Sequence, residues 1–127
     1  MKIKILAAVL FLILLININT LAQSNSVKPK VIFVELGSVN CIPCKQMQPV
    51  MKSIEEKYGS QIKVVFYDVW KTEQKQYAKM YGIRLIPTQV FLDADGKEFH
   101  RHEGFYPEEV IDTILQSKGL KPNNKEG

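Results

Sequence analysis

Cys41 and Cys44 are the only two cysteines of the chain, and they enclose the dipeptide Ile42-Pro43. Two thiols three positions apart at a helix start can form a disulfide with each other. The backbone N–H groups of a helix N-terminus can also stabilise a thiolate and lower its pKa from the free value of about 8.5. A pair held in this way exchanges two electrons with other thiols, so the pattern predicts thiol–disulfide exchange.

The position of each cysteine relative to the helix predicts its role. Cys41 lies at or just before the first turn, where unpaired N–H groups favour an anion, so we expect it to be the attacking sulfur. Cys44 lies one turn further on, and we expect it to be more buried and to resolve the mixed disulfide. A purely structural disulfide is the alternative, although a bridge across so short a loop constrains the unfolded chain little.

The segments around the pair predict a strand before it and a helix after it. Residues 31–36 are mostly β-branched, aromatic and apolar, which is typical of a buried strand, and residues 37–40 predict a turn. Apolar side chains then recur at spacings of three and four up to Gly59, a pattern that predicts a helix with one buried face. These side chains are Met47, Val50, Met51, Ile54 and Tyr58.

The middle of the chain predicts a second strand and a short helix. Residues 62–69 are apolar enough for a central strand, and Thr72 can cap a helix that ends at Gly82. A strand–helix–strand unit implies parallel pairing through a right-handed crossover.

The last third of the chain predicts a hairpin and a third helix. Residues 88–92 and 97–103 are expected to pair across the turn at 93–96, and Pro107 can begin the helix. The buried stripe of this helix is expected to contain Val110, Ile111, Ile114 and Leu115. The fold class is therefore α/β, with a four-stranded mixed sheet flanked by three helices.

Composition indicates one small globular domain, because the 127 residues are 46% apolar and 24% charged. Outside residues 1–22 the chain has 15 basic and 13 acidic residues, a balance too even to indicate nucleic-acid binding. We expect residues 31–120 to form the domain, 23–30 to lead into it and 121–127 to form a flexible tail.

The N-terminus predicts export. Lys2 and Lys4 precede an unbroken apolar run over residues 5–16, and residues 20–22 supply small side chains for a signal peptidase. The run is shorter than the roughly 20 residues that span a bilayer, so residues 1–22 predict a cleaved signal peptide. An uncleaved N-terminal anchor is the alternative. After cleavage the chain would begin near Gln23, outside the cytoplasm.

From residue 31 to residue 115 the sequence resembles the thioredoxin family. The motif Cys41-Ile42-Pro43-Cys44-Lys45 is similar to the family's CxPCK, and Pro49 lies where the family's helix has a proline. Residues 81–88, Tyr-Gly-Ile-Arg-Leu-Ile-Pro-Thr, resemble the segment around the family's cis-proline. The family's extra N-terminal strand and helix are expected to be missing, because residues 23–30 are too few to form them.

The resemblance also implies supporting residues. Pro87 is expected to form a cis peptide bond with Ile86, to lie beside the cysteines and to leave the Ile86 backbone free to pair with a substrate. A trans proline that begins a strand is the alternative. Glu35 corresponds to a buried carboxylate that can exchange a proton with Cys44, unless it points to solvent. Pro43 belongs to the dipeptide that tunes the reduction potential.

Three positions depart from the family pattern. Asn40 replaces the tryptophan before the first cysteine, and Gly37 replaces an aromatic residue. The lysine that often pairs with the buried acid is replaced by an apolar residue near Val64. Trp70, which follows a strand, is expected either to contact substrate or to lie at the rim of the core.

No metal site or cofactor is predicted. His100 and His102 are expected to be solvated residues of an edge strand, although with the two cysteines they could form an S2N2 shell. A copper carrier that uses Cys41, Cys44 and one histidine therefore stays open as an alternative function.

The sequence as a whole predicts an exported, monomeric protein-disulfide reductase. The resemblance implies oxidised cysteine pairs of exported proteins as substrates and a membrane electron-conducting thiol reductase as partner, in cytochrome c maturation or disulfide repair. An oxidase or isomerase of the same fold is the alternative direction.

Overall fold

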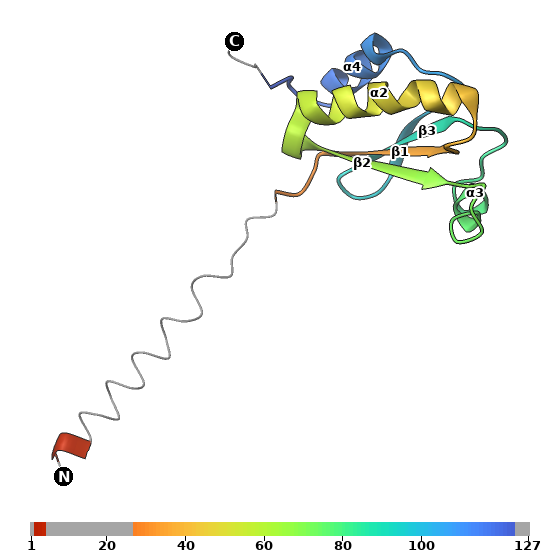
Figure 1. Ribbon diagram of the computed structural model, residues 1–127. Helices are drawn as coiled ribbons and strands as arrows, with labels where there is room; N and C mark the ends of the chain where they lie inside the picture. The colour runs from red at the N-terminus through yellow and green to blue at the C-terminus, as the bar shows by residue number, and fades with distance from the viewer. Residues whose placement is uncertain (1, 5–26, 124–127) are drawn as a thin grey trace.

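The computed structural model describes residues 2–4 and 27–123, and residues 27–123 contain the sheet and its helices (Figure 1). The predicted order of elements is confirmed. The elements are β1 (Val31–Gly37), α2 (Ile42–Tyr58), the 3-10 turn η2 (Gly59–Gln61), β2 (Ile62–Asp68), α3 (Gln76–Met80), β3 (Thr88–Asp93), β4 (Glu98–Glu103) and α4 (Glu108–Ser117). The predicted signal peptide lies outside the described residues except for residues 2–4, as does the end of the predicted tail, residues 124–127.

The four strands form one mixed sheet, as predicted, and their order is β2-β1-β3-β4. β1 is parallel to β2 and antiparallel to β3, and β4 is antiparallel to β3. The expectation that β2 is central is wrong, because it pairs only with β1. Its apolar residues are explained by the helix above them, since Val64 and Phe66 pack against the core on that face.

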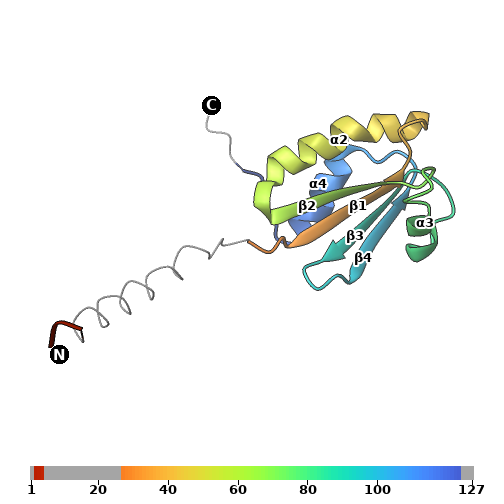
Figure 2. The same ribbon diagram turned by 60° about the horizontal axis from the view of Figure 1, so that its bottom comes forward.

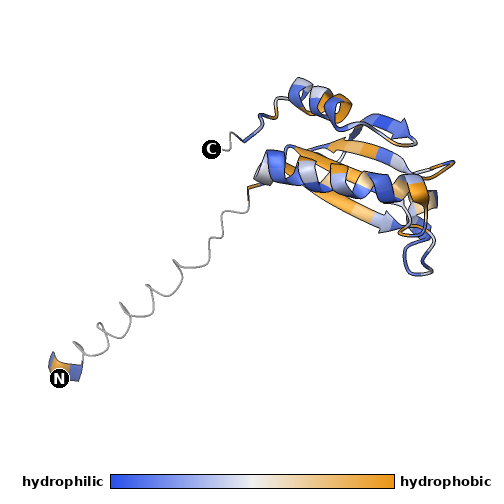
Figure 3. Ribbon diagram, turned by 45° about the horizontal axis from the view of Figure 1, so that its top comes forward, coloured by the Kyte–Doolittle hydropathy of each residue, from blue (hydrophilic) through white to orange (hydrophobic). Residues whose placement is uncertain are grey.

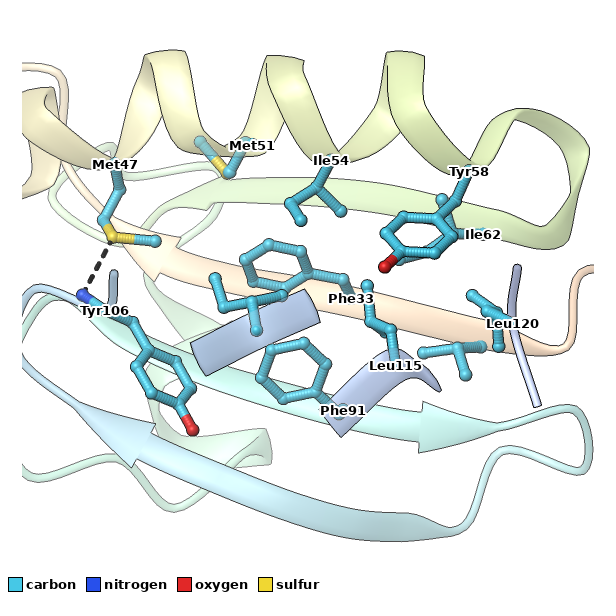
Figure 4. Packing of buried hydrophobic residues seen from close by; sticks show 12 residues of the cluster. Phe33, Met47, Met51, Ile54, Tyr58, Ile62, Phe91, Tyr106, Leu115 and Leu120 are labelled. Atoms are coloured by element: carbon cyan, nitrogen blue, oxygen red, sulfur yellow. Dashed lines mark hydrogen bonds between the residues drawn. The ribbon is translucent and has the colours of Figure 1, made fainter. Parts of the chain in front are cut away.

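Helices cover both faces of the sheet, with α2 and α4 on one face and the short α3 on the other (Figure 2). Strands β1 and β3 are coloured mostly as hydrophobic in Figure 3, whereas α2 is amphipathic. Under α2 and α4, Phe33 stacks on Phe91 with ring centroids 4.7 Å apart. The surrounding core side chains are shown in Figure 4. This packing holds α2 and α4 against one face of the sheet.

The strand directions bring four loops to one edge of the sheet. Since β1, β2 and β4 run the same way and β3 runs opposite, the loops after β1, β2 and β4 lie beside the loop before β3. α2 begins at this edge (Figure 1). We call this edge the active edge, because the two cysteines lie there.

Two local predictions are wrong. α3 begins at Gln76 rather than after Thr72, because residues 71–75 form turns joined by the bonds from Gln74 N and Lys75 N to Lys71 O. In α4, Val110 is 43% exposed, while Ile111 and Leu115 are fully buried. The stripe of α4 is therefore narrower than predicted, since only one side of this helix faces α2 and the sheet.

Within residues 27–123 no strand or helix precedes β1. None of the helices in the described part of the chain combines the length and the hydropathy needed to cross a membrane.

Candidate active site

The two cysteines lie at the start of α2 and are joined by a disulfide, with Cα atoms 5.2 Å apart. Cys41 is the N-cap residue in an extended conformation, and Cys44 lies in the first turn. Cys44 is completely buried, whereas Cys41 retains 8% exposure. A partner can therefore reach Cys41 more easily than Cys44.

The first turn of α2 provides a favourable environment for a thiolate. No side chain caps it and none of its residues is acidic, so its N–H groups are not neutralised by a carboxylate. Pro43, the second helical residue, has no N–H group. The free N–H groups nearest the N-cap sulfur are therefore those of Ile42 and Cys44. These dipoles stabilise an anion at Cys41 when the disulfide is reduced.

Gly37 allows Cys44 to lie directly on the end of β1. A Cβ atom at Gly37 would be 3.2 Å from Cys44 Sγ and 3.3 Å from the ring of Phe66. Any side chain at position 37 would therefore meet Cys44 and Phe66. Cys44 therefore lies above Gly37 on the sheet, and the position of Glu35 on the same strand can be given relative to it.

Glu35 lies two residues before Gly37 on β1, so both face α2. Its side chain is completely buried, which excludes the alternative that it points to solvent. Burial raises the pKa of Glu35 to about 8, and the hydrogen bond from Gln89 opposes this rise. The residue opposite Glu35 on β2 is the apolar Phe66, and no charged side chain of the described residues contributes to the shift of the Glu35 pKa. Glu35 can therefore bind or release a proton near neutral pH, about 7 Å along the strand from the position under Cys44.

The Ile86–Pro87 peptide bond is cis, which is the conformation that the sequence predicted. Pro87 O accepts a 2.7 Å bond from Gly104 N, and Thr88 Oγ1 donates to Leu85 O, so both sides of the bond are held. Among the described residues, the Ile86 N–H and C=O form no backbone hydrogen bond. Ile86 therefore presents an unpaired backbone at the active edge, which suits an extended peptide.

Asp68, at the end of β2, is a supporting residue that sequence reasoning missed. It is buried, and its carboxylate accepts hydrogen bonds from the N–H groups of Val39 and Trp70. Although burial opposes ionisation, these bonds hold its pKa below the usual range. Asp68 thereby links the loop before Cys41 to the loop after β2. The sequence feature that could have predicted this role is a single acidic residue near the end of an otherwise apolar strand.

The two histidines lie in a small aromatic cluster with Tyr106. His102 stacks on Tyr106 with centroids 3.8 Å apart, and His100 Nε2 lies 2.8 Å from the Tyr106 hydroxyl. Both lie on the edge strand β4, as predicted, but they are partly buried and therefore less solvated than expected. Within the described residues no group of three or more potential ligands is arranged for a metal. The S2N2 shell is therefore not formed.

Apolar side chains surround the cysteines at the active edge. Trp70 is 62% exposed, so it lies on the surface rather than at the rim of the core, and it shares a shallow hollow with Leu85 and Ile86. The other exposed apolar side chains on loops of this edge are Val39 and Phe105, with Ile42 at the helix start. Such a surface is suited to contact with a protein chain.

Comparisons with known proteins agree with this geometry. Residues 19–119 match the thioredoxin-like domain family. A thioredoxin of Bacillus subtilis (strain 168) is 31% identical over 85 residues, which cover 67% of this chain and 79% of that protein. Thioredoxin Y, chloroplastic, of Oryza sativa subsp. japonica is 35% identical over 88 residues, with 69% of this chain and 51% of that protein covered.

Solved structures show the same likeness. A mutant thioredoxin from Halobacterium salinarum NRC-1 superposes with a TM-score of 0.63 at 26% identity, covering 71% of this chain and 75% of that chain. The germline-specific thioredoxin Deadhead of Drosophila melanogaster gives 0.62 at 28% identity, with 73% and 84% covered. With its Cys41–Cys44 disulfide at a helix start, the chain belongs to the thioredoxin family and is a thiol–disulfide oxidoreductase.

Proposed function

We propose that this oxidoreductase is exported and reduces disulfides in other exported proteins. The observation that carries the proposal is the pairing of a nearly buried cysteine pair, surrounded by apolar side chains, with an N-terminal sequence typical of a signal peptide. Outside the cytoplasm a reductant needs an electron donor in the membrane, so the partner is a membrane thiol reductase. Cytochrome c maturation and disulfide repair are the processes that need such a reductant.

In the proposed reaction, the Cys41 thiolate attacks one sulfur of a substrate disulfide. The Cys41–substrate bond forms, and the second substrate sulfur leaves with the electron pair and takes up a proton. Glu35 then accepts the Cys44 proton, and the Cys44 thiolate attacks Cys41 Sγ. The Cys41–Cys44 bond forms and the first substrate sulfur leaves as a thiolate, so the substrate has gained two electrons and the enzyme is oxidised.

The roles of the cysteines are tested by trapping. Cys44→Ser should accumulate mixed disulfides on Cys41, because no second thiol displaces the substrate, and non-reducing electrophoresis with mass spectrometry identifies them. Cys41→Ser is the matched control and should trap few partners. If Cys41→Ser captures the same proteins instead, the assignment is reversed.

The direction is tested by the reduction potential in a glutathione or dithiothreitol redox buffer. Reduction predicts a value near that of thioredoxin, about −270 mV, whereas an oxidase predicts one near about −120 mV. The Ile42-Pro43 dipeptide has no histidine and no positive charge, so it adds nothing to the stabilisation of the Cys41 thiolate by the helix itself, and this favours the reducing direction.

Export is tested by fusing residues 1–30 to a reporter that is active only outside the cytoplasm. We expect reporter activity and a mature N-terminus near Gln23. An active reporter with an intact N-terminus would instead support the membrane anchor, and an inactive reporter would contradict export.

A further inference from the structure

In the part of the chain that the structure describes, the Glu35 side chain forms one hydrogen bond, with Gln89. The two residues face each other across the β1–β3 ladder, and both side chains are completely buried. Gln89 Nε2 donates a 3.3 Å hydrogen bond to Glu35 Oε1. Glu35 Oε2 and Gln89 Oε1 are the two buried side-chain atoms that have no partner within the described residues.

These two unpaired atoms are both acceptors when Glu35 is ionised, and buried acceptors without donors are costly. A single proton on Glu35 Oε2 turns one of them into a donor. It can then bond to Gln89 Oε1, so one proton satisfies both atoms. The result is a ring of two hydrogen bonds, N–H to O and O–H to O, between a carboxylic acid and an amide.

We propose that Gln89 is a positioning residue for Glu35. In the disulfide form of the protein the two side chains form this acid–amide ring, and the ring opens when Glu35 loses its proton. The inference rests on the proposed proton exchange between Glu35 and Cys44. In that exchange the Cys44 S–H bond breaks and the Glu35 O–H bond forms. The ring then holds the transferred proton while the Cys41–Cys44 bond is made.

Other titratable groups near the pair are few. Cys44 faces it from α2 and does not titrate in the disulfide form, and His102 lies opposite Gln89 on β4. Tyr106, which covers His102, has a pKa that burial raises above its usual value. From β2 the residue opposite Glu35 is Phe66, and the buried side chains of α4 are the apolar Ile111 and Leu115.

Infrared spectroscopy of the disulfide form tests the ring directly. At pH 6 we expect a protonated carboxyl band that disappears in Glu35→Gln and that moves to higher frequency in Gln89→Met, because the acid then loses both hydrogen bonds. Val90→Ala, on the opposite face of β3, is the control for a general loss of packing and should leave the band in place. A band that Gln89→Met does not move, or an ionised Glu35 at pH 6, would overturn the ring.

Wild-type protein provides a second measurement if Gln89→Met does not fold. The ¹³Cδ resonance of Gln89 should titrate with the same midpoint as that of Glu35, and it should not titrate in Glu35→Gln. His102→Asn should leave the midpoint unchanged, which separates the effect of Glu35 from that of the residue opposite Gln89 on β4. A Gln89 resonance that does not follow Glu35 would contradict the ring.

Kinetics separate this inference from the proposed function. In single-turnover release of substrate from Cys41, Gln89→Met should lower the pH midpoint by about one unit, because the protonated acid loses two hydrogen bonds and the carboxylate only one. The same substitution should have no effect on the midpoint in a Glu35→Gln background. If Glu35→Gln leaves the release rate unchanged while the infrared band behaves as expected, the proton-transfer role fails and the ring stands.

Discussion

At the scale of single residues, the site depends on what is missing as much as on the two thiols. Pro43 contributes no N–H, and Gly37 has no side chain where Cys44 meets the sheet. The φ angle of Gly37 is not positive, so an alanine would not strain the backbone. Its cost would come from contact with Cys44 and Phe66 alone.

Gly37→Ala should therefore reduce the free energy of unfolding by about 1–3 kcal/mol, the usual cost of overpacking. Urea unfolding of the oxidised and reduced proteins measures it. In the reduced protein, a Cys44→Ala background should relieve part of the cost, because it removes the sulfur that lies 3.2 Å from the new Cβ. Equal costs in both backgrounds would show that the Cys44 sulfur is not the obstacle.

At the scale of elements, the start of α2 is positioned by the end of β2. The carboxylate of Asp68 accepts the Val39 N–H at 3.3 Å and the Trp70 N–H at 3.2 Å, and Ser38 O accepts the Cys41 N–H. Two loops that are far apart in sequence are thus tied together beside the disulfide. The geometry of Cys41 depends on this link between elements.

Asp68→Asn should cost about 1.5–3 kcal/mol in the free energy of unfolding at pH 7, because an amide replaces a charged acceptor of buried N–H groups. Since the folded pKa of Asp68 lies below the unfolded value of 3.8, its contribution is complete above that value and is lost as pH falls through the folded pKa. The difference between the two proteins should therefore shrink in acid. Asp95→Asn, at an exposed hairpin position, is the control and should leave the free energy of unfolding unchanged at both pH values.

At the scale of the whole molecule, a buried acid links global stability to pH. Glu35 keeps its proton up to about pH 8 when folded, whereas its ordinary value is 4.5. Between these values the unfolded chain binds fewer protons than the folded one, so stability falls as pH rises. This trend is opposite to that of a carboxylate held in an ion pair.

We expect the free energy of unfolding of the disulfide form to fall with a slope approaching about 1.4 kcal/mol per pH unit between these limits. Glu35→Gln should remove this slope and be more stable than wild type near pH 8. Chemical denaturation at several pH values measures both. A wild-type profile parallel to that of Glu35→Gln would mean that Glu35 is ionised in the folded protein throughout the range.

The chemistry and the order of elements were predictable because they depend on local patterns. Two cysteines at a helix start, the apolar spacing after them and the turn residues before the last two strands all act over a few positions in sequence. The burial of Val110 and the start of α3 were mispredicted because they depend on tertiary contacts. The burial and the hydrogen bonds of these residues depend on which neighbour each face meets, and spacing alone does not specify that neighbour.

By itself the sequence determined the thiol pair, the family and the likeness of residues 81–88 to a cis-proline segment, because each of these features depends on the residue types within a few neighbouring positions. Only the tertiary structure decided that Glu35 is buried and opposite Gln89, that Gly37 lies under Cys44, and that Asp68 supports the loop before Cys41. These are contacts between strands and loops distant in sequence, and the register of the sheet creates them. The order of residue types along the chain does not specify that register, which is fixed only when the strands pair.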